Sequence, residues 1–154
     1  MAAVSDHASK TGSIAVTGPT GFVGREFVRT LGGAGLAVKP LSREDLQRFT
    51  EHRGDEAGLP PGSRCVVHLA ARAHVLDETS TAQLEVYRRV NRDLTLKLAR
   101  AATRAGVRRF VFVSSIQVNG SSSERAFRAQ DDPRPEEPYA ISKYEAEQGL
   151  WEIA

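Results

Sequence analysis

Three polar side chains in the second half of the chain have the types and spacing needed for proton transfer. Tyr139 and Lys143 lie four residues apart, so they share one face if their segment is a helix. A free tyrosine has a pKa of about 10, and a nearby ammonium group lowers that pKa by favouring the phenolate. Ser115 can hydrogen-bond a substrate oxygen on which charge changes. We expect Tyr139 to move the proton, Lys143 to tune its pKa and Ser115 to orient the substrate. The alternative for the pair alone is a solvated helix face, where a tyrosine and a lysine at this spacing are common.

A glycine-rich segment near the start of the chain predicts an anion site. Residues 17–24 read TGPTGFVG, between the apolar run Ile14–Val16 and an amphipathic stretch over residues 22–31. This is the order of a strand, a turn and a helix, and a helix N-terminus attracts anions through its free N–H groups and its dipole. Tight helix–strand packing is the alternative reason for these glycines. We expect a pyrophosphate to be bound by Gly18, Thr20, Gly21, Phe22, Val23 and Gly24.

The rest of the chain alternates predicted strands and helices. We expect strands at 14–17, 36–41, 64–69 and 107–114, helices at 21–31, 42–49 and 80–105, and a last helix that begins at Pro138. Pro40 indicates an edge strand or a strand end, and residues 46–50 are a candidate for one more strand. The run 107–114 reads as a buried strand, and 121–137 as a polar loop. This alternation predicts a doubly wound parallel sheet, whose ligands bind at the carboxyl ends of the strands.

Taken together, these motifs resemble the extended short-chain dehydrogenase/reductase family of NAD(P)-dependent sugar-nucleotide epimerases, dehydratases and 4-keto reductases. The family's T-G-x-x-G-x-x-G loop matches residues 17–24, its Y-x-x-x-K pair matches Tyr139 and Lys143, and its catalytic Ser or Thr matches Ser115. The run VVHLAA at 66–71 resembles its fourth-strand signature. The resemblance covers nearly all of residues 13–154. It implies an α/β Rossmann-type fold with helices on both faces, and further cofactor contacts at Leu69, Ala70, Ala71, Asn91, Tyr139 and Lys143, the last on the ribose.

Two polar residues near these motifs have competing readings. His68 fits a structural histidine at a strand end better than an acid or base, and His74 lies near the cofactor mouth by position alone. Asn91 interrupts an otherwise regular helical pattern. The family places an asparagine in this helix that supports a proton path, and a simple polar helix position is an equally good account of Asn91.

The residues after the predicted second strand bear on the choice of cofactor. NAD enzymes usually place an acidic residue there for the ribose 2′-hydroxyl, whereas an arginine suits the 2′-phosphate of NADP. This chain has Ser42 and Arg43 there, and its acids are displaced to Glu44 and Asp45. We expect Ser42 and Arg43 to contact NAD(P), with NADP favoured and NAD not excluded. The alternative is that Arg43 is a solvated loop charge.

The residues that follow Ser115 bear on the reaction. Family dehydratases typically follow the catalytic Thr with an Asp-Glu pair, and here Ile116 and Gln117 follow Ser115, which weakens the dehydratase reading. The run 114–120, SSIQVNG, looks most like bacterial UDP-sugar 4-epimerases and 4-keto reductases of surface-polysaccharide pathways. The resemblance therefore implies a nucleotide-sugar substrate, hydride transfer at sugar C4 and Tyr139 as the acid/base.

Composition excludes several other classes of protein. The 154 residues carry a formal net charge of +2 with acids and bases interspersed, which does not suggest nucleic-acid binding. The single cysteine, Cys65, cannot form an internal disulfide, and no cysteine/histidine spacing suits a metal site. No apolar run approaches the ~20 residues that a membrane span needs, and residues 1–13 lack a signal-peptide core. We therefore expect a cytoplasmic protein.

The length of the chain sets its expected organisation. We divide it into a flexible arm at residues 1–12 and an NAD(P)-binding domain at 13–154. Members of the family continue well past the position of Lys143 with a substrate domain. We therefore expect this chain to be the N-terminal part of a longer enzyme and to be inactive alone. Members of the family dimerise through two long helices, and we expect the same contact here. In the short chain we expect Trp151 on the last of these helices to be exposed. A non-catalytic dinucleotide-binding or interaction module is the alternative, although it would need none of Ser115, Tyr139 and Lys143.

Overall fold

A parallel four-stranded sheet forms the centre of the computed structural model, which describes residues 12–51, 58–73 and 80–154. The expected arm and His74 lie outside these residues, apart from Gly12. The strands are β1 (Ser13–Thr17), β2 (Val38–Leu41), β3 (Ser63–His68) and β4 (Arg109–Phe112), in the order β2-β1-β3-β4. Registered pairs join Thr17 to Leu41, Thr17 to His68 and His68 to Phe112, so the carboxyl ends of the strands form one row.

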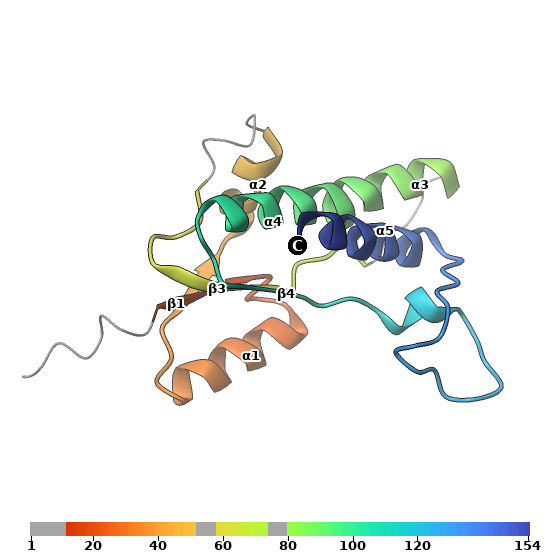
Figure 1. Ribbon diagram of the computed structural model, residues 1–154, viewed down its shortest axis with the longest axis horizontal. Helices are drawn as coiled ribbons and strands as arrows, with labels where there is room; N and C mark the ends of the chain where they lie inside the picture. The colour runs from red at the N-terminus through yellow and green to blue at the C-terminus, as the bar shows by residue number, and fades with distance from the viewer. Residues whose placement is uncertain (1–11, 52–57, 74–79) are drawn as a thin grey trace, which may run out of the picture.

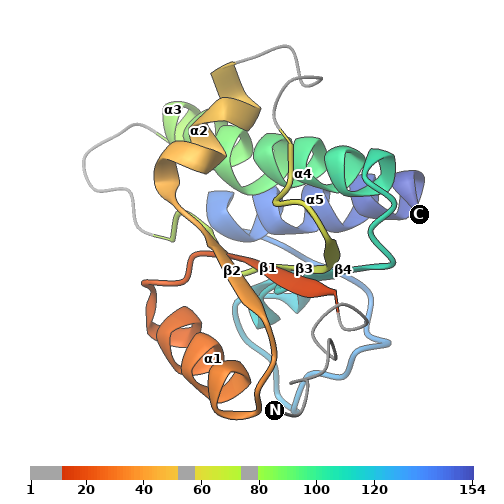
Figure 2. The same cartoon turned by 90° about the vertical axis from the view of Figure 1, so that its left-hand side faces the viewer.

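Helices cover both faces of the sheet, as the alternating pattern predicts (Figures 1 and 2). On one face lies α1 (Phe22–Gly33), and on the other lie α2 (Arg43–Glu51), α3 (Ser80–Tyr87), α4 (Leu94–Arg104) and α5 (Pro138–Ile153). The loop between β4 and α5 contains the short 3-10 helix η2 (Ile116–Asn119) and, over residues 120–137, no helix or strand. No helix in the described part of the chain is long and apolar enough to cross a membrane. The doubly wound α/β fold is therefore confirmed.

The main core lies between the sheet and helices α2 and α4. Its members are apolar side chains that are almost fully removed from solvent: Ala15, Leu41, Phe49, Val66, Leu94, Leu98, Ala101 and Ala102. Phe49 belongs to α2, which begins after a reciprocal cap between Ser42 and Asp45. The expected helix at 42–49 is confirmed, and the candidate strand at 46–50 is wrong, because this cap commits the segment to a helix that turns Phe49 into the core.

One edge strand agrees with the sequence-based expectation and the other differs from it. Pro40 lies in the edge strand β2, as expected. The buried strand expected at 107–114 is shorter, and its Val111 and Val113 are 38% and 44% exposed. Side chains alternate along a strand, so Phe110 packs toward the core cluster while Val111 faces the side where α1 lies. Because α1 makes its contacts with β1 and β2, this part of β4 stays uncovered.

The long helix expected at 80–105 is interrupted in its middle. Between α3 and α4 the chain forms a π-helical turn, η1 (Arg88–Asp93), with Asn91 buried inside it. Such turns inside α-helices are rare and frequently mark functional sites. The predicted helical pattern is interrupted at Asn91, and the structure has a π-helical turn at that position.

Helix α5 is fastened to this turn by ion pairs and by close packing. Glu145 on α5 accepts hydrogen bonds from Arg88 at 2.5–3.1 Å and from Arg92 at 3.1 Å. The hydrogen bond from Arg88 lowers the pKa of the Glu145 carboxyl. A side chain at Gly149 would come within 2.7 Å of Leu96 on α4, so the glycine permits the two helices to approach. The position of α5 is thus set by η1 and α4.

We predict that Gly24→Ala destabilises the fold by ~1–3 kcal/mol, as overpacking does. A Cβ atom at Gly24 would lie 2.0 Å from the backbone oxygen of Gly18, which cannot move without the turn. The matched control on the same helix is Gly32→Ala, whose Cβ would meet nothing within 4 Å and which should gain ~0.5–1 kcal/mol from helix propensity. Urea unfolding measures both, and equal stabilities of the two variants would contradict the argument.

Candidate active site

The glycine turn follows β1 and passes directly beneath the loop after β3. Gly18 has φ +66°, a left-handed conformation, and a Cβ there would lie 2.8 Å from the backbone nitrogen of Ala70. Gly24 packs on the Gly18 carbonyl, so tight packing alone accounts for that glycine. Gly21 is different, because its Cβ would meet only the Gly18 oxygen, at 3.4 Å. The protein's own packing therefore does not require a glycine at position 21.

Helix α1 begins directly after this turn, and no side chain caps its first amide groups. Gly21 is the N-cap and supplies no side-chain cap, and the first turn of the helix contains no acidic residue. Thr20, Gly21, Phe22 and Val23 are all exposed. Uncapped N–H groups at the positive end of a helix dipole suit an anion.

The loop after β3 is held from both sides. At its start, the N–H groups of Leu69 and Ala70 donate to the Thr17 hydroxyl at 3.1 and 3.0 Å. Two residues further on, the Asn91 side chain accepts from the N–H of Arg72 at 2.8 Å and donates to its carbonyl at 3.0 Å. Asn91 is 1% exposed, so these bonds fix the loop against the π-helical turn. The backbone of Leu69 and Ala70 therefore lies beside the glycine turn, and Ala71 follows directly in the chain.

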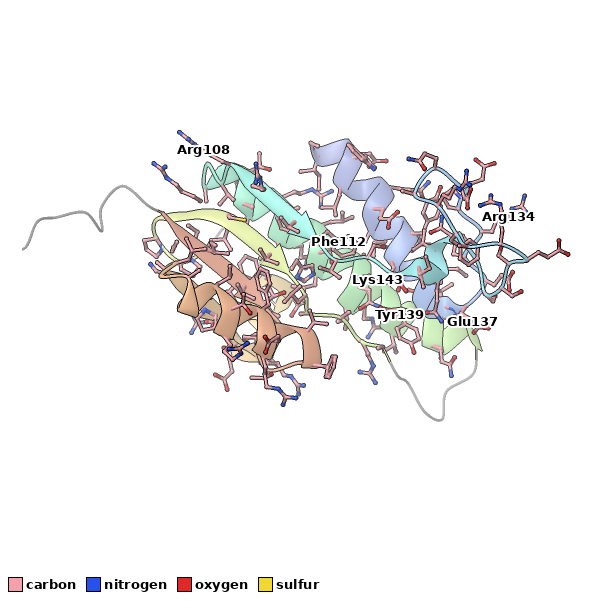
Figure 3. All side chains as sticks on the ribbon, turned by 90° about the horizontal axis from the view of Figure 1, so that it is seen from below. Arg108, Phe112, Arg134, Glu137, Tyr139 and Lys143 are labelled. Carbon is pink, nitrogen blue, oxygen red and sulfur yellow. The ribbon has the colours of Figure 1, made fainter. Side chains whose placement is uncertain are left out.

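Of the predicted acid–base residues, Tyr139 and Lys143 lie on α5 near Phe112 at the end of β4 (Figure 3). Ser115 lies close enough to Tyr139 to act on its pKa, and the Tyr139 ring packs edge-on against Tyr87, with ring centroids 5.9 Å apart. Burial raises the pKa of the Tyr139 hydroxyl, with the Ser115 side chain acting in the opposite direction. The structure thus brings Ser115 and Tyr139 together in a partly buried site.

Lys143 lies one turn along α5 and points toward the end of β4. Its ammonium group donates to the Val113 carbonyl at 2.7 Å and lies 3.9 Å from the centre of the Phe112 ring. Lys143 is 2% exposed, and burial lowers its pKa to about 8. The expected lowering of the Tyr139 pKa by Lys143 does not occur in this arrangement, because the ammonium group is directed at Val113 and burial dominates at Tyr139.

Ser42 and Arg43, which we expect to bear on the choice between NAD and NADP, lie at the carboxyl end of β2. Leu41 pairs with Thr17, so Ser42 and Arg43 follow next to the glycine turn. The Asp45 carboxylate accepts both from the N–H and from the hydroxyl of Ser42, at 2.8 and 2.9 Å, and the backbone bond is the main cause of its lowered pKa. Asp45 is thus engaged in capping α2, while Arg43 is exposed.

Four residues that were not among the predicted site residues complete the interior of the site. The His68 ring lies between the hydroxyls of Thr17 and Thr95, at 2.6 and 2.9 Å. Ser142 accepts from Asn91 at 3.0 Å and donates to the Tyr139 carbonyl at 2.7 Å. A polar residue at the end of a buried strand and a serine next to Lys143 were available signals for Thr17 and Ser142. No local signal marks Tyr87 or Thr95, whose partners lie far away in the sequence.

His68 itself is a structural histidine in this arrangement. It is 1% exposed, and burial lowers its pKa to about 3, with the Lys143 charge as the second cause. Within the part of the chain that the structure describes, no group of three or more His, Cys, Asp or Glu residues could hold a metal ion.

Comparisons with known proteins point to one family. The sequence model of the NAD dependent epimerase/dehydratase family matches residues 14–154. The chain is 39% identical to UDP-glucose 4-epimerase of Vibrio cholerae over 92% of its length and 47% of that protein's. It is 35% identical to dTDP-glucose 4,6-dehydratase of Streptomyces griseus over 86% of its length and 47% of that protein's.

A solved structure gives the same result for the fold. The structure of MoeE5 in complex with UDP-glucose and NAD is 29% identical in sequence and superposes with a TM-score of 0.75, covering 92% of this chain and 49% of that one. The chain thus spans about half the length of the relatives that it matches.

We predict that the free energy of unfolding falls as the pH is lowered from 6.5 to 5, because the unfolded chain binds a proton at His68 that the folded chain, with its lowered pKa, does not. The slope of the free energy of unfolding against pH should reach up to ~1.4 kcal/mol per pH unit. This pH interval lies above the range in which carboxylates titrate. Urea unfolding at several pH values measures the slope for wild type and His68→Asn. A slope that is unchanged in the variant would show that His68 is not the group responsible.

Proposed function

The chain belongs to the NAD dependent epimerase/dehydratase family, and from that premise we propose that the whole protein is an NAD(P)-dependent sugar-nucleotide 4-epimerase or 4-keto reductase. The observation that carries the proposal is the proximity of the Ser115 and Tyr139 side chains, with Lys143 one turn further along α5. A non-catalytic dinucleotide-binding module, the main alternative, would need none of these three residues.

The residues present fit a dinucleotide along the carboxyl edge of the sheet. Gly21 leaves room beside the uncapped N-terminus of α1 that a Cβ would fill, although no protein atom demands a glycine there. At the other end of the site the Ser114 hydroxyl is buried without a hydrogen-bond partner, so a bound group could satisfy it. The phosphates would lie at residues 18–24, and Lys143 would hold the ribose beside Tyr139. When bound, the nicotinamide would carry the hydride.

The protein's own part in the reaction is the movement of one proton. The raised pKa of Tyr139 keeps its hydroxyl protonated near neutral pH, which suits donation to the oxygen of a 4-keto sugar. The Ser115 hydroxyl, which lies close to Tyr139, would hold the same oxygen. Removal of a proton from a 4-hydroxyl, which an epimerase also needs, requires the Tyr139 pKa to fall when the site is filled.

The dehydratase activity of some relatives is less well supported. Water loss needs an additional acid and base close to the sugar, and the positions after Ser115 hold Ile116, which is 63% exposed, and Gln117. Neither side chain can serve as a general acid or base. We therefore place epimerase and reductase chemistry ahead of dehydration.

We also propose that the protein dimerises through α5 and the long helical segment of α3, η1 and α4. Trp151 on α5 is 82% exposed, and an exposed aromatic side chain of this size suits an interface. Sedimentation at high concentration decides this proposal, and a strictly monomeric whole protein would overturn it.

We predict that Gly21→Val abolishes dinucleotide binding while the protein remains folded. The new side chain would fill the space beside the α1 amide groups, yet the protein tolerates a Cβ there at 3.4 Å from Gly18. Gly32→Val, at the far end of the same helix, is the control and should bind as wild type does. Calorimetry that finds equal affinities for Gly21→Val and Gly32→Val would remove the glycine turn from the cofactor site.

We predict equal use of the two cofactors or a preference for NADP, because Arg43 is exposed beside the glycine turn while Asp45 is engaged in its cap. Arg43→Ala should weaken NADP binding about tenfold, the scale of one hydrogen bond to a charged group, and leave NAD binding unchanged. Arg48→Ala on α2 is the control. A strong preference for NAD that survives Arg43→Ala would contradict this role.

We predict that Tyr139→Phe lowers kcat of the whole protein by ~10²–10⁴, the usual contribution of positioned proton transfer, and leaves cofactor affinity within a few fold. Assays with UDP-sugars and 4-keto sugars measure this effect. Tyr144→Phe, on the same helix, is the matched control and should turn over as wild type does. Turnover by Tyr139→Phe equal to that of the control would remove Tyr139 from the mechanism.

A further inference from the structure

His68 connects two parts of the site that are far apart in the sequence. Its Nδ1 lies 2.6 Å from the hydroxyl oxygen of Thr17 at the end of β1, and its Nε2 lies 2.9 Å from that of Thr95 on α4. Both ring nitrogens are thus engaged in the interior. A side chain that is 1% exposed cannot reach a substrate, so the ring does not act as an acid or base.

The direction of each hydrogen bond follows from counting donors. The Thr17 oxygen already accepts from the N–H groups of Leu69 and Ala70, which occupies both of its lone pairs. Its own hydrogen must therefore be donated to His68 Nδ1. A neutral imidazole that accepts at Nδ1 carries its hydrogen on Nε2, and Thr95 accepts that hydrogen.

The chain of bonds continues to the helix that carries Tyr139. Thr95 donates its hydrogen to the Asn91 carbonyl at 2.7 Å, and the Asn91 side chain donates to Ser142. Ser142 in turn donates to the Tyr139 carbonyl at 2.7 Å. Each hydroxyl and amide group in this series has a partner. If the His68 hydrogen were on Nδ1 instead of Nε2, two hydrogens would face each other at Thr17 and two lone pairs would face each other at Thr95.

The groups around the His68 ring disfavour the binding of a second proton to it. The Phe110 and Phe112 rings lie 6.2 and 5.9 Å away, and the Lys143 charge opposes protonation. Phe112 separates the ring from Lys143, whose ammonium group lies over the Phe112 ring. The neutral form with its hydrogen on Nε2 is therefore the one form that satisfies every neighbour.

We propose that His68 is a positioning residue. Because it bonds both Thr95 and Thr17, the position of the Leu69 and Ala70 backbone, and so of the glycine turn, depends on the position of Thr95 and the π-helical turn. The backbone of Ala70 lies directly against Gly18, so a shift of this loop must move the turn. The inference rests on the proposed function in one respect, namely that the turn binds a dinucleotide.

The first experiment perturbs Thr95, whose hydroxyl bonds His68 on one side and the Asn91 carbonyl on the other. Thr95→Val removes the hydroxyl that accepts from Nε2. Amide hydrogen exchange of Leu69 and Ala70 should speed up about three- to tenfold relative to Val16, as loss of one neutral hydrogen bond implies. Thr103→Val is the matched control, because Thr103 also donates to the carbonyl four residues earlier on α4, at 3.1 Å, but has no histidine partner. Equal exchange at Leu69 and Ala70 in both variants would overturn the proposal.

The second experiment tests whether His68 carries the effect. His68→Asn can still accept from Thr17 through its amide oxygen, but its shorter side chain places no donor at the Nε2 position beside Thr95. Calorimetry should find NADP binding about three- to tenfold weaker in Thr95→Val, and no further weakening when Thr95→Val is added to His68→Asn. If Thr95 acted on the site independently of His68, the two effects would add, and that result would overturn the proposal.

One outcome separates this inference from the proposed function. If wild type binds neither NAD nor NADP, the proposed function fails, while the exchange experiment still decides the role of His68. Nitrogen NMR of the His68 ring supplies the last check. The hydrogen on Nε2 and no titration between pH 5 and 8 support the proposal, and a hydrogen on Nδ1 overturns it.

Discussion

The buried hydroxyl of Thr17 is the interaction on which the arrangement of the site depends. It receives the first two amide groups of the loop after β3 and gives its hydrogen to His68, so the ends of β1 and β3 are joined by side-chain bonds beyond the sheet. Gly18 can then pass against Ala70 with no room for a Cβ. A buried donor left unpaired costs ~1–3 kcal/mol, so the three bonds to Thr17 hold two loops in one relative position.

The Tyr139 side of the site depends on a comparable buried group. Asn91 uses its whole amide to bind Arg72 and Ser142, and the π-helical turn places that amide between the loop and α5. The ion pairs of Glu145 with Arg88 and Arg92 act on the same two elements from the more exposed side. Exposed ion pairs contribute little, so the buried amide is the stronger restraint on where Tyr139 lies.

Much of the fold could be predicted from the sequence because its signals are local. The strand, glycine turn and first helix, the cap at Ser42 and the shared face of Tyr139 and Lys143 each follow from spacing within a few residues. The π-helical turn could not be predicted, because it is stabilised by partners from Arg72 and Ser142, far away in the chain. The exposure of Val111 also depends on which part of the sheet α1 covers, and no local pattern contains that information.

The Lys143 charge shows the same limit within the site. Its spacing from Tyr139 predicted an ammonium group close enough to tune the tyrosine, and the face they share is as expected. The group is instead directed at the Val113 carbonyl and the Phe112 ring, both supplied by the end of β4. Sequence spacing fixes which residues share a face, whereas the direction of a long side chain depends on the acceptors that the tertiary fold provides.

The central claim is that the carboxyl edge of this sheet is a dinucleotide site that extends from the glycine turn to Tyr139. Titration of the isotope-labelled protein with NAD or NADP, followed by NMR, tests it most directly. The account predicts shifts of the amide signals at residues 18–24, 69–72 and 115, and unchanged signals for Arg64 and Arg108 at the opposite edge. Shifts confined to Arg64 and Arg108, or no shifts with either dinucleotide, would contradict it.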